Sequence, residues 1–468
     1  MSSGKLILIS NAEPYAHEDN QGEIVQEKQP GGLTTGLDPL MQEEKGLWVA
    51  WGRGEADFEM VDEDNTVQVP DEDGYTLKRL NLSQQEVQGF YYGFSNSTLW
   101  PISHNFVTRA SFSPDSWEKY RRVNRKYARA ALEEACEKDW IWIQDYQLCL
   151  VPGLIREKMP SAKIAHFWHI PWPAAEIFSA IPWRQELLEG LLGSDLLGFH
   201  NTTYLHNFLQ TALRSGAEVD WEQNLVHYQG RTTRLTAIPL GIDYDYFSSM
   251  AKKDEIGEEA ERIREYYDVE HLLIGIDRLD YTKGIVPRLK AIEKLLDLYP
   301  EYREEIVLIQ RVAPSRTDIP EYQKMREKID RTVGEINGRF QTVPWEPICY
   351  FWDSLPQEEL IPYYLAADAA FITPLIDGLN LVSKEYLASR EDGQLILSEF
   401  AGVSEQLEEA FHVNPYHIEE VAETIHEALQ EDSKSKHRRC KKLRQRISGQ
   451  DIGWWREKFL EEWENCYE

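Results

Sequence analysis

Cysteine is scarce in this chain, with five among 468 residues, and long hydrophobic runs are missing. The cysteines are scattered and form no Cys-X-X-Cys pair, which excludes a disulfide framework and a typical zinc site. The first apolar run, Leu6–Ile9, is shorter than a signal-peptide core, and no stretch approaches the ~18 apolar residues that span a membrane. We therefore expect a reduced, cytoplasmic protein with no membrane partner.

Positive charge is also in short supply, because 80 acidic residues outnumber 50 lysines and arginines and give a formal net charge of −30. Such a surface repels phosphate backbones and anionic lipids, so no nucleic acid is expected as a partner. One segment, Lys434–Arg446, is densely basic. We interpret it as a solvated helix face rather than a patch that binds anions or nucleic acid.

The sequence also lacks the common catalytic motifs, namely the Walker A loop, GxGxxG, GxSxG and HExxH. Acidic triplets occur at Asp62–Asp64 and Asp71–Asp73, in a polar, hairpin-like stretch. Their setting favours solvated turn residues over metal ligands. Accordingly, we expect no metal and no cofactor.

Short apolar runs alternate with amphipathic helical patterns along most of the chain. These runs are continuous, which is typical of strands buried on both faces of a parallel sheet. They are Lys5–Ser10, Gly46–Trp51, Trp140–Asp145, Lys163–His169, Asp195–Phe199, Leu235–Leu240, Leu272–Asp277, Glu305–Arg311, Ala369–Leu375 and Gln394–Glu399. The pattern predicts an α/β fold with doubly wound sheets.

Two stretches interrupt this alternation. The charged segment Lys252–Glu270 separates two series of strands and indicates a boundary between domains 1–245 and 246–450. Asn11–Gly32 is a polar connection of about 20 residues, longer than structural loops usually are. We expect it to be a lid or a disordered loop.

In the second half, two predicted strands end in loops that carry charged residues. Arg278 and Lys283 lie just before a helix, whose free amides could join them in binding a diphosphate. Equally, both cations could form an ion-pair network with Asp277 and Asp280. The next such loop, Ile376–Asn380, contains Asp377 for sugar hydroxyls and Gly378 for close backbone approach, and Glu385 follows for a ribose diol. Two such loops on one domain favour a nucleotide-sugar site.

The first half offers a carboxylate and an imidazole at adjacent strand ends, Asp145 and His169. They could orient sugar hydroxyls or share proton transfer, although a structural histidine is the more common outcome. Tyr91 and Trp100 flank a Gly-Phe-Ser-Asn-Ser stretch and could offer flat apolar faces to pyranose rings. Core packing is the alternative for both aromatic residues.

Taken together, these segments resemble the trehalose-6-phosphate synthase family of retaining glycosyltransferases. The resemblance rests on GGLTTGL, FYYGFSNSTLWP, WIWIQDYQLCLVPGLIR, FWHIPWPAAEIF, GIDRLDYTKGI and TPLIDGLNLVSKEY, which run in order through most of the chain. It implies a GT-B architecture of two Rossmann-like domains that face a central cleft, with a C-terminal helix, 451–468, returning to the first domain. The implied partners are a nucleotide-glucose donor and a phosphorylated acceptor, first of all glucose 6-phosphate. Assembly into a homo-oligomer is left open.

The resemblance also implies residue roles. For the donor, Gly32 approaches the diphosphate, Arg278 and Lys283 neutralise it, His169 contacts the glucose and Glu385 binds the ribose. The donor sugar is held by Asp377 and by the backbone of Gly378, Leu379, Asn380, Leu381 and Val382. Asp145, Tyr91, Trp100 and Arg316 bind the acceptor. The implied catalytic set is Arg278, Lys283, Asp145, His169 and Asp377, without a metal.

One position departs from the family pattern. The first strand of the family usually ends in Ser-Asn-Arg, whose arginine reaches the acceptor phosphate, whereas this chain has Ala12. His17, Arg53 and Arg109 are possible substitutes that the sequence does not rank. The change keeps two other functions open, a glucosylglycerol-phosphate synthase that uses glycerol 3-phosphate and a non-catalytic sugar-phosphate sensor.

Overall fold

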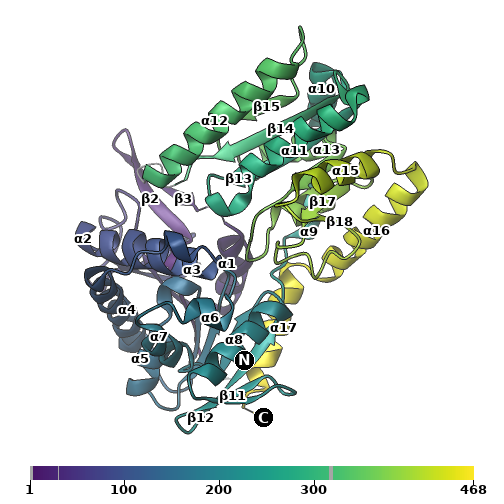
Figure 1. The fold of residues 1–468 in the computed structure, drawn as a ribbon. Coiled ribbons are helices and arrows are strands. Elements are labelled where there is room, and N and C mark those ends of the chain that lie inside the picture. Colours follow the sequence, from purple (N-terminus) through teal and green to yellow (C-terminus); the bar gives the residue numbers. More distant parts are fainter. Residues whose placement is uncertain (1–3, 30, 316–319, 468) are drawn as a thin grey trace. The chain divides into compact units, whose positions relative to one another are not determined.

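The computed structural model describes residues 4–29, 31–315 and 320–467. The chain forms two compact units (Figure 1). The first comprises Met1–Pro239 and Trp455–Glu468, and the second comprises Leu240–Trp454. The chain thus crosses between units at Leu240 and Trp455, where the sequence led us to expect 246 and 451.

The first unit is built on a ten-stranded sheet in the order β10-β11-β12-β9-β8-β7-β1-β4-β6-β5. Its strands are β1 (Leu6–Ala12), β4 (Leu47–Trp51), β5 (Thr66–Val69), β6 (Tyr75–Leu80), β7 (Trp140–Gln144), β8 (Lys163–Phe167), β9 (Leu196–Phe199), β10 (Glu218–Asp220), β11 (Leu225–Tyr228) and β12 (Arg231–Ala237). The pairs from β12 to β6 are parallel, and the edge pairs are antiparallel. All parallel strands therefore present their carboxyl ends along one edge of the sheet.

The second unit has a six-stranded, fully parallel sheet in the order β15-β14-β13-β16-β17-β18. Its strands are β13 (His271–Arg278), β14 (Ile306–Ala313), β15 (Ile348–Phe351), β16 (Ala369–Ile372), β17 (Gln394–Ser398) and β18 (Phe411–Val413). Of the two central strands, β16 is wholly buried, and β13 is buried except at His271, Ile276 and Arg278, in keeping with their largely apolar sequences.

Helices cover the sheets of both units (Figure 1). In the first unit they are α1 (Gly32–Glu44), α2 (Gln84–Val87), η1 (Gln88–Leu99), α3 (Trp100–Ser103), η2 (Val107–Arg109), α4 (Pro114–Glu134), η3 (Tyr146–Leu148), α5 (Val151–Lys158), α6 (Ala175–Phe178), α7 (Arg184–Leu191), α8 (Thr202–Arg214) and α17 (Ile452–Glu464). In the second they are α9 (Tyr244–Met250), α10 (Asp254–Tyr267), η4 (Tyr281–Lys283), α11 (Ile285–Leu298), η5 (Pro300–Tyr302), α12 (Pro320–Phe340), α13 (Gln357–Ala366), α14 (Val382–Ser389), α15 (Ile418–Leu429) and α16 (Ser433–Gly449).

The predicted α/β class and all ten predicted strands are confirmed, with ends that differ by a few residues. The long loop predicted over Asn11–Gly32 is wrong, because it contains a two-stranded hairpin of β2 (Tyr15–Asn20) and β3 (Glu23–Lys28). Gln21 and Gly22 form its turn, with φ of 57° and 90°. A tight two-residue hairpin turn of this type requires a positive φ at both positions. The β3 side chains are mostly exposed, so this strand has no apolar alternation.

Helix α17 supplies part of the core of the first unit. The Trp455 and Phe459 rings lie 5.4 Å and 4.7 Å from the ring of Trp142 on β7, and all three side chains are fully buried. Large aromatic rings that stack in this way stabilise a core strongly, since each buries 150–250 Å². None of the helices in the described part of the chain is long and apolar enough to span a bilayer.

Candidate functional site

Two loops of the second unit lie together at the carboxyl ends of β13 and β16. The backbone N–H of Leu375 donates to the carbonyl of Thr282 at 2.7 Å, which ties the loop after β16 to the loop after β13. Gly284 begins α11 with a φ of 65°, and a Cβ at this position would lie 2.2 Å from the carbonyl oxygen of Thr373. Glycine is therefore needed for both the backbone conformation and the close approach of the loops.

The side chains of these loops meet in an ion pair. The Lys283 Nζ lies 2.6 Å from Asp377 Oδ2, and the Asn380 side-chain amide donates to the same oxygen at 3.2 Å. Asp377 is also held by its backbone, since its N–H donates to Phe400 and its carbonyl accepts from Gly402. The loop geometry thus fixes the ammonium group of Lys283 at the strand ends.

Arg278 behaves differently from Lys283. It is the last residue of β13, its side chain is exposed, and no carboxylate in the described part of the chain pairs with it. Asp277 pairs instead with the buried Arg288, and Asp280 caps η4 through the backbone N–H of Thr282. The expected alternative, a closed network of both cations with Asp277 and Asp280, is therefore not what these loops form.

The backbone after Asp377 adopts an unusual conformation. Asn380 has a φ of 87°, and its side-chain oxygen accepts hydrogen bonds from the N–H and hydroxyl of Ser383. A non-glycine residue at such an angle costs of order 1–3 kcal/mol and is often found at functional sites. The predicted sugar-binding backbone, Gly378, Leu379, Asn380, Leu381 and Val382, follows Asp377 directly and leads into α14.

Glu385 lies in the first turn of α14 and is partly buried. Its carboxylate accepts a hydrogen bond from the Tyr364 hydroxyl at 2.9 Å, and burial raises its pKa from 4.5 to about 7. The neighbouring Lys384 is fully buried, donates to the carbonyl of Leu240 at 2.6 Å, and has its pKa lowered from 10.5 to about 7 by burial. Two ionisable groups in such surroundings are uncommon outside functional sites.

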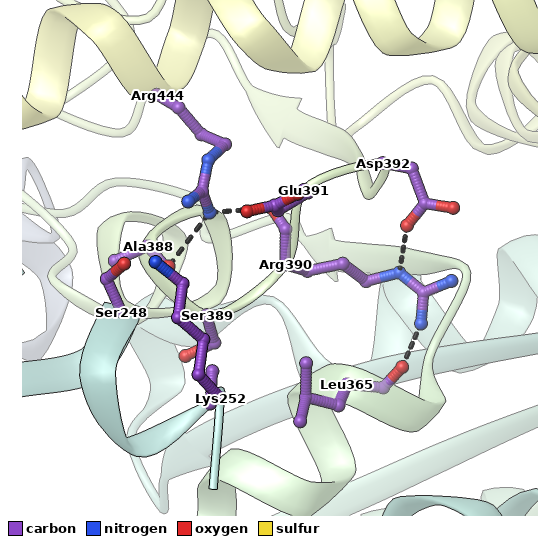
Figure 2. A pocket seen from close by; sticks show the side chains of 10 residues that line it. Ser248, Lys252, Leu365, Ala388, Ser389, Arg390, Glu391, Asp392 and Arg444 are labelled. Atoms are coloured by element: carbon purple, nitrogen blue, oxygen red, sulfur yellow. Dashed lines mark hydrogen bonds and ion pairs between the residues drawn. The ribbon is translucent and has the colours of Figure 1, made fainter. Parts of the chain in front are cut away.

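Helix α14 ends at a pocket of about 330 Å³ (Figure 2). It is lined in part by Lys252, Arg390 and Arg444 and by none of the predicted site residues. The Arg444 guanidinium donates to the carbonyls of Leu387, Ala388 and Arg390, where it satisfies the last turn of the helix. All three bonds are made by the Nη1 of Arg444, which holds the guanidinium against the end of the helix.

Arg444 belongs to the basic segment that the sequence analysis interpreted as solvated. Within it, Arg439 pairs with Glu431, and Arg446 donates to the carbonyl of Gln406. These arginines attach α16 to the rest of the second unit, whereas Lys434, His437, Arg438, Lys441 and Lys442 are exposed, as the predicted solvated helix face requires. Among the described residues, no group of three or more His, Cys, Asp or Glu side chains could hold a metal ion.

In the first unit, Asp145 and His169 follow the adjacent strands β7 and β8. Asp145 has a left-handed φ of 69°, accepts the backbone N–H of His169 at 3.2 Å, and has its pKa raised from 3.8 to about 7 by burial. Burial also lowers the pKa of His169 to about 3, so its imidazole is neutral at physiological pH. Backbone strain and buried ionisable groups of this kind often occur together at functional sites.

His169 has partners that the sequence analysis missed. One ring nitrogen, Nε2, lies 2.9 Å from the Gln144 side-chain oxygen, and Nδ1 lies 3.3 Å from His200 Nε2. Both partners occupy strand ends, Gln144 on β7 and His200 just after β9. The sequence did indicate that Gln144 and His200 lie at the same carboxyl edge of the sheet as His169. Polar residues at strand ends are so common, however, that this position alone does not identify them as its partners.

Tyr91 and Trp100 lie on consecutive helical segments, η1 and α3. Helix η1 is a π-helix, and its ladder ends where the N–H of Trp100 donates to the carbonyl of Ser95 five residues earlier. The ring of Trp100 lies 5.9 Å from Tyr146, directly after Asp145, whereas Tyr91 packs against Trp51 at 5.9 Å. π-Helical turns are rare and occur often at functional sites.

The predicted residues thus fall into two groups. Arg278, Lys283, Asp377 and Glu385 lie in the second unit. In the first unit lie Tyr91, Trp100, Asp145, His169 and Gly32, which opens α1. Arg316 lies outside the described residues.

Comparison with known proteins assigns almost the whole chain to one family. The model of glycosyltransferase family 20 matches residues 4–465. A trehalose-6-phosphate synthase from Mycobacterium avium (strain 104) is 38% identical over 467 residues, which cover 97% of this chain and 94% of the relative.

Solved structures agree in fold. An α,α-trehalose-phosphate synthase (UDP-forming) from Burkholderia xenovorans in complex with glucose-6-phosphate has a TM-score of 0.88 and 30% identity, covering 98% of this chain and 100% of that chain. An E. coli trehalose-6-phosphate structure bound with UDP-2-fluoro glucose has a TM-score of 0.89 and 30% identity, with coverage of 98% and 99%. This protein has the α/β GT-B fold and belongs to glycosyltransferase family 20.

Proposed function

We propose that this protein transfers glucose from UDP-glucose to glucose 6-phosphate, with retention of configuration, and releases trehalose 6-phosphate and UDP. The observation that carries the proposal is the match along almost the whole chain to trehalose-phosphate synthases, in sequence and in structure. The structures similar to this chain include one with glucose-6-phosphate and one with UDP-2-fluoro glucose, which supports the choice of acceptor and donor.

In the proposed reaction, the bond from the donor's anomeric carbon to the β-phosphate oxygen breaks, and a bond to the acceptor's anomeric oxygen forms on the same face. The proton of the acceptor hydroxyl passes to the departing phosphate, so no protein nucleophile is required. Negative charge develops on the leaving diphosphate, where fixed cations are most effective. Arg278, which has no acidic partner among the described residues, and Lys283, fixed by Asp377, are the proposed cations.

The residues of the first unit are proposed to bind sugars rather than to transfer protons. Both ring nitrogens of the neutral His169 have protein partners, so we propose that a glucose hydroxyl replaces His200, the more distant of the two, when the donor binds. The low pKa of His169 makes it a poor general base. The carboxylate of Asp145 accepts a hydrogen bond from a hydroxyl of the acceptor sugar. The rings of Tyr91 and Trp100 lie against the same sugar. In the second unit, the carboxylate of Glu385 accepts hydrogen bonds from the ribose hydroxyls of the donor.

Two further expectations accompany this function. We propose the cytoplasm as its location, because a nucleotide sugar and a hexose phosphate carry charges that keep both inside the cell. A homo-oligomer stays a prediction, which light scattering of the purified protein would test.

The decisive experiment is a matrix of donors and acceptors. Release of nucleoside diphosphate would be measured for UDP-, ADP- and GDP-glucose against glucose 6-phosphate, glycerol 3-phosphate and no acceptor. We expect turnover with UDP-glucose and glucose 6-phosphate. Preferred use of glycerol 3-phosphate would establish the alternative acceptor, and tight binding without turnover would establish a sensor.

Arg278→Ala tests the proposed chemistry. Loss of one preorganised donor to the leaving group should lower kcat by about 10²–10³-fold. Arg262→Ala is the matched control, because Arg262 is exposed on α10 and pairs only with glutamates of its own helix among the described residues. A near-normal rate for Arg278→Ala would contradict the assignment.

A further inference from the structure

A phosphorylated acceptor requires a cation near its phosphate, and the first strand of this chain offers none, since it ends at Ala12. His17, Arg53 and Arg109 are the candidates that the sequence leaves open. All three lie in the first unit. His17 is buried, whereas Arg53 and Arg109 are exposed.

His17 is enclosed and is not a cation. Its side chain is 5% exposed, and its Nδ1 lies 2.7 Å from the guanidinium of Arg79 and 3.7 Å from Asp57. Burial and the charge of Arg79 both lower the pKa of His17, so the ring is neutral at physiological pH. Arg79 itself is fully buried and is occupied by Glu13 and Asp57. Neither residue can reach a ligand as a free charge.

Arg53 lies beside Ala12 and presents its charge to solvent. It follows β4 by two residues, and β4 pairs with β1 so that Trp51 stands opposite Ala12. The backbone N–H of Arg53 donates to Glu13 at 2.7 Å, which fixes the arginine against the end of β1. Its side chain is exposed, and no carboxylate in the described ranges pairs with it.

Two aromatic rings orient the guanidinium of Arg53. Its central carbon lies 4.5 Å from the centroid of the Trp51 ring and 5.5 Å from that of Tyr91. A guanidinium on an aromatic face keeps its N–H groups free for a planar, two-pronged contact with phosphate. Tyr91 is one of the residues expected to bind the acceptor, so the cation and the sugar-binding ring are in direct contact.

A buried acceptor atom lies at the same strand end. The side-chain oxygen of Asn11, immediately before Ala12, is buried and receives no hydrogen bond from any described residue. Buried polar atoms of this kind usually have a partner, and a ligand hydroxyl could supply one here. This atom is a second indication, independent of Arg53, that a polar ligand binds at the end of β1.

We propose that Arg53 binds the phosphate of the acceptor and takes the place of the arginine that this chain lacks at position 12. Trp51 and Tyr91 hold the guanidinium in position, and Glu13 fixes its backbone. The inference rests on the proposed function for the existence of a phosphorylated acceptor.

Steady-state kinetics of Arg53→Ala would test the assignment. A charge-assisted hydrogen bond is worth enough to predict a rise of about 10- to 100-fold in KM for glucose 6-phosphate. The KM for the nucleotide sugar should stay unchanged. Arg53→Lys should lie between the two because lysine offers a point charge without the fork.

Matched variants make the result specific. Arg129→Ala removes a surface arginine of α4 that pairs only with Glu133 among the described residues, and it should behave as wild type. In the double variant Ala12→Arg/Arg53→Ala, the family's arginine is restored, and the KM for glucose 6-phosphate should recover. Circular dichroism would establish that each variant is folded.

Two results would overturn the assignment. One is a KM for glucose 6-phosphate in Arg53→Ala within about two-fold of wild type, and the other is a large rise in Arg109→Ala but not in Arg53→Ala. Failure of the proposed function would look different, because the wild-type protein would then turn over no phosphorylated acceptor and would not bind glucose 6-phosphate in calorimetry.

Discussion

Replacing Asp145 with asparagine should stabilise the first unit while abolishing most of its activity. The carboxyl group is buried, and burial raises its pKa from 3.8 to about 7. Below pH 3.8 the group is neutral in both the folded and the unfolded chain, so its burial does not lower the free energy of unfolding. As the pH rises, the unfolded chain ionises first, and above pH 7 the folded protein carries the full cost of a buried charge. At 1.36 kcal/mol per pKa unit, this cost is roughly 4 kcal/mol.

The measurement is urea denaturation at pH 5 and pH 8.5, followed by tryptophan fluorescence, since most tryptophans lie in the first unit. Asp145→Asn should raise the free energy of unfolding by up to roughly 4 kcal/mol at pH 8.5 and by less than half of that at pH 5. The asparagine oxygen can still accept the N–H of His169, so little compensating loss is expected. We expect kcat to fall by about 10²-fold or more, because a carboxylate is the stronger acceptor for a sugar hydroxyl.

Asp139→Asn is the matched control. Asp139 is a buried aspartate at the other end of β7 that accepts backbone N–H groups from Lys5 and Cys136. Its replacement should leave activity intact and should not stabilise the protein. The reasoning would be refuted if Asp145→Asn kept wild-type activity, or if its effect on stability were the same at both pH values.

Three further predictions follow from buried groups. Burial raises the pKa of Glu385 to about 7, so the KM for the nucleotide sugar should rise as the pH falls from 8 to 6, and Glu385→Gln should remove this dependence. Burial lowers the pKa of Lys384 from 10.5 to about 7, so its destabilisation of the fold grows as the pH falls from 10.5 to 7 and is complete below pH 7. Lys384→Met should therefore raise the melting temperature more at pH 6 than at pH 10. Trp455→Ala should lower the free energy of unfolding by about 3–5 kcal/mol in urea, because it removes a fully buried ring; a change below about 1 kcal/mol would contradict the role assigned to α17.

The sheets were predictable because burial on both faces leaves a clear mark in the sequence. β1, β7 and β13 each contain a continuous apolar run, Leu6–Ile9, Trp140–Ile143 and Leu272–Ile274, as expected for strands covered on both faces of a parallel sheet. The charged residues that follow β13 and β16 were predictable for a related reason. Carboxyl ends of parallel strands share one edge, so loops that are far apart in the sequence, such as those of Lys283 and Asp377, come into contact.

Other features of the structure have no recognisable pattern in the sequence. The hairpin of β2 and β3 was missed because the side chains of β3 face solvent, and a polar strand has the composition of a loop. The π-helix η1 was missed because its shift from four- to five-residue hydrogen bonding depends on packing rather than on propensity. Partnerships such as Lys283 with Asp377 rather than Asp280 depend on loop geometry that the sequence does not specify.

The placement of α17 has a consequence for how the protein is made. The second unit is one continuous stretch of chain, so it can complete its core as soon as it leaves the ribosome. The first unit begins earlier but must wait, with the apolar surface around Trp142 uncovered, until synthesis reaches Phe459. During that interval the uncovered apolar surface of the first unit can aggregate. The unit that is translated first is therefore the last to complete its folded core.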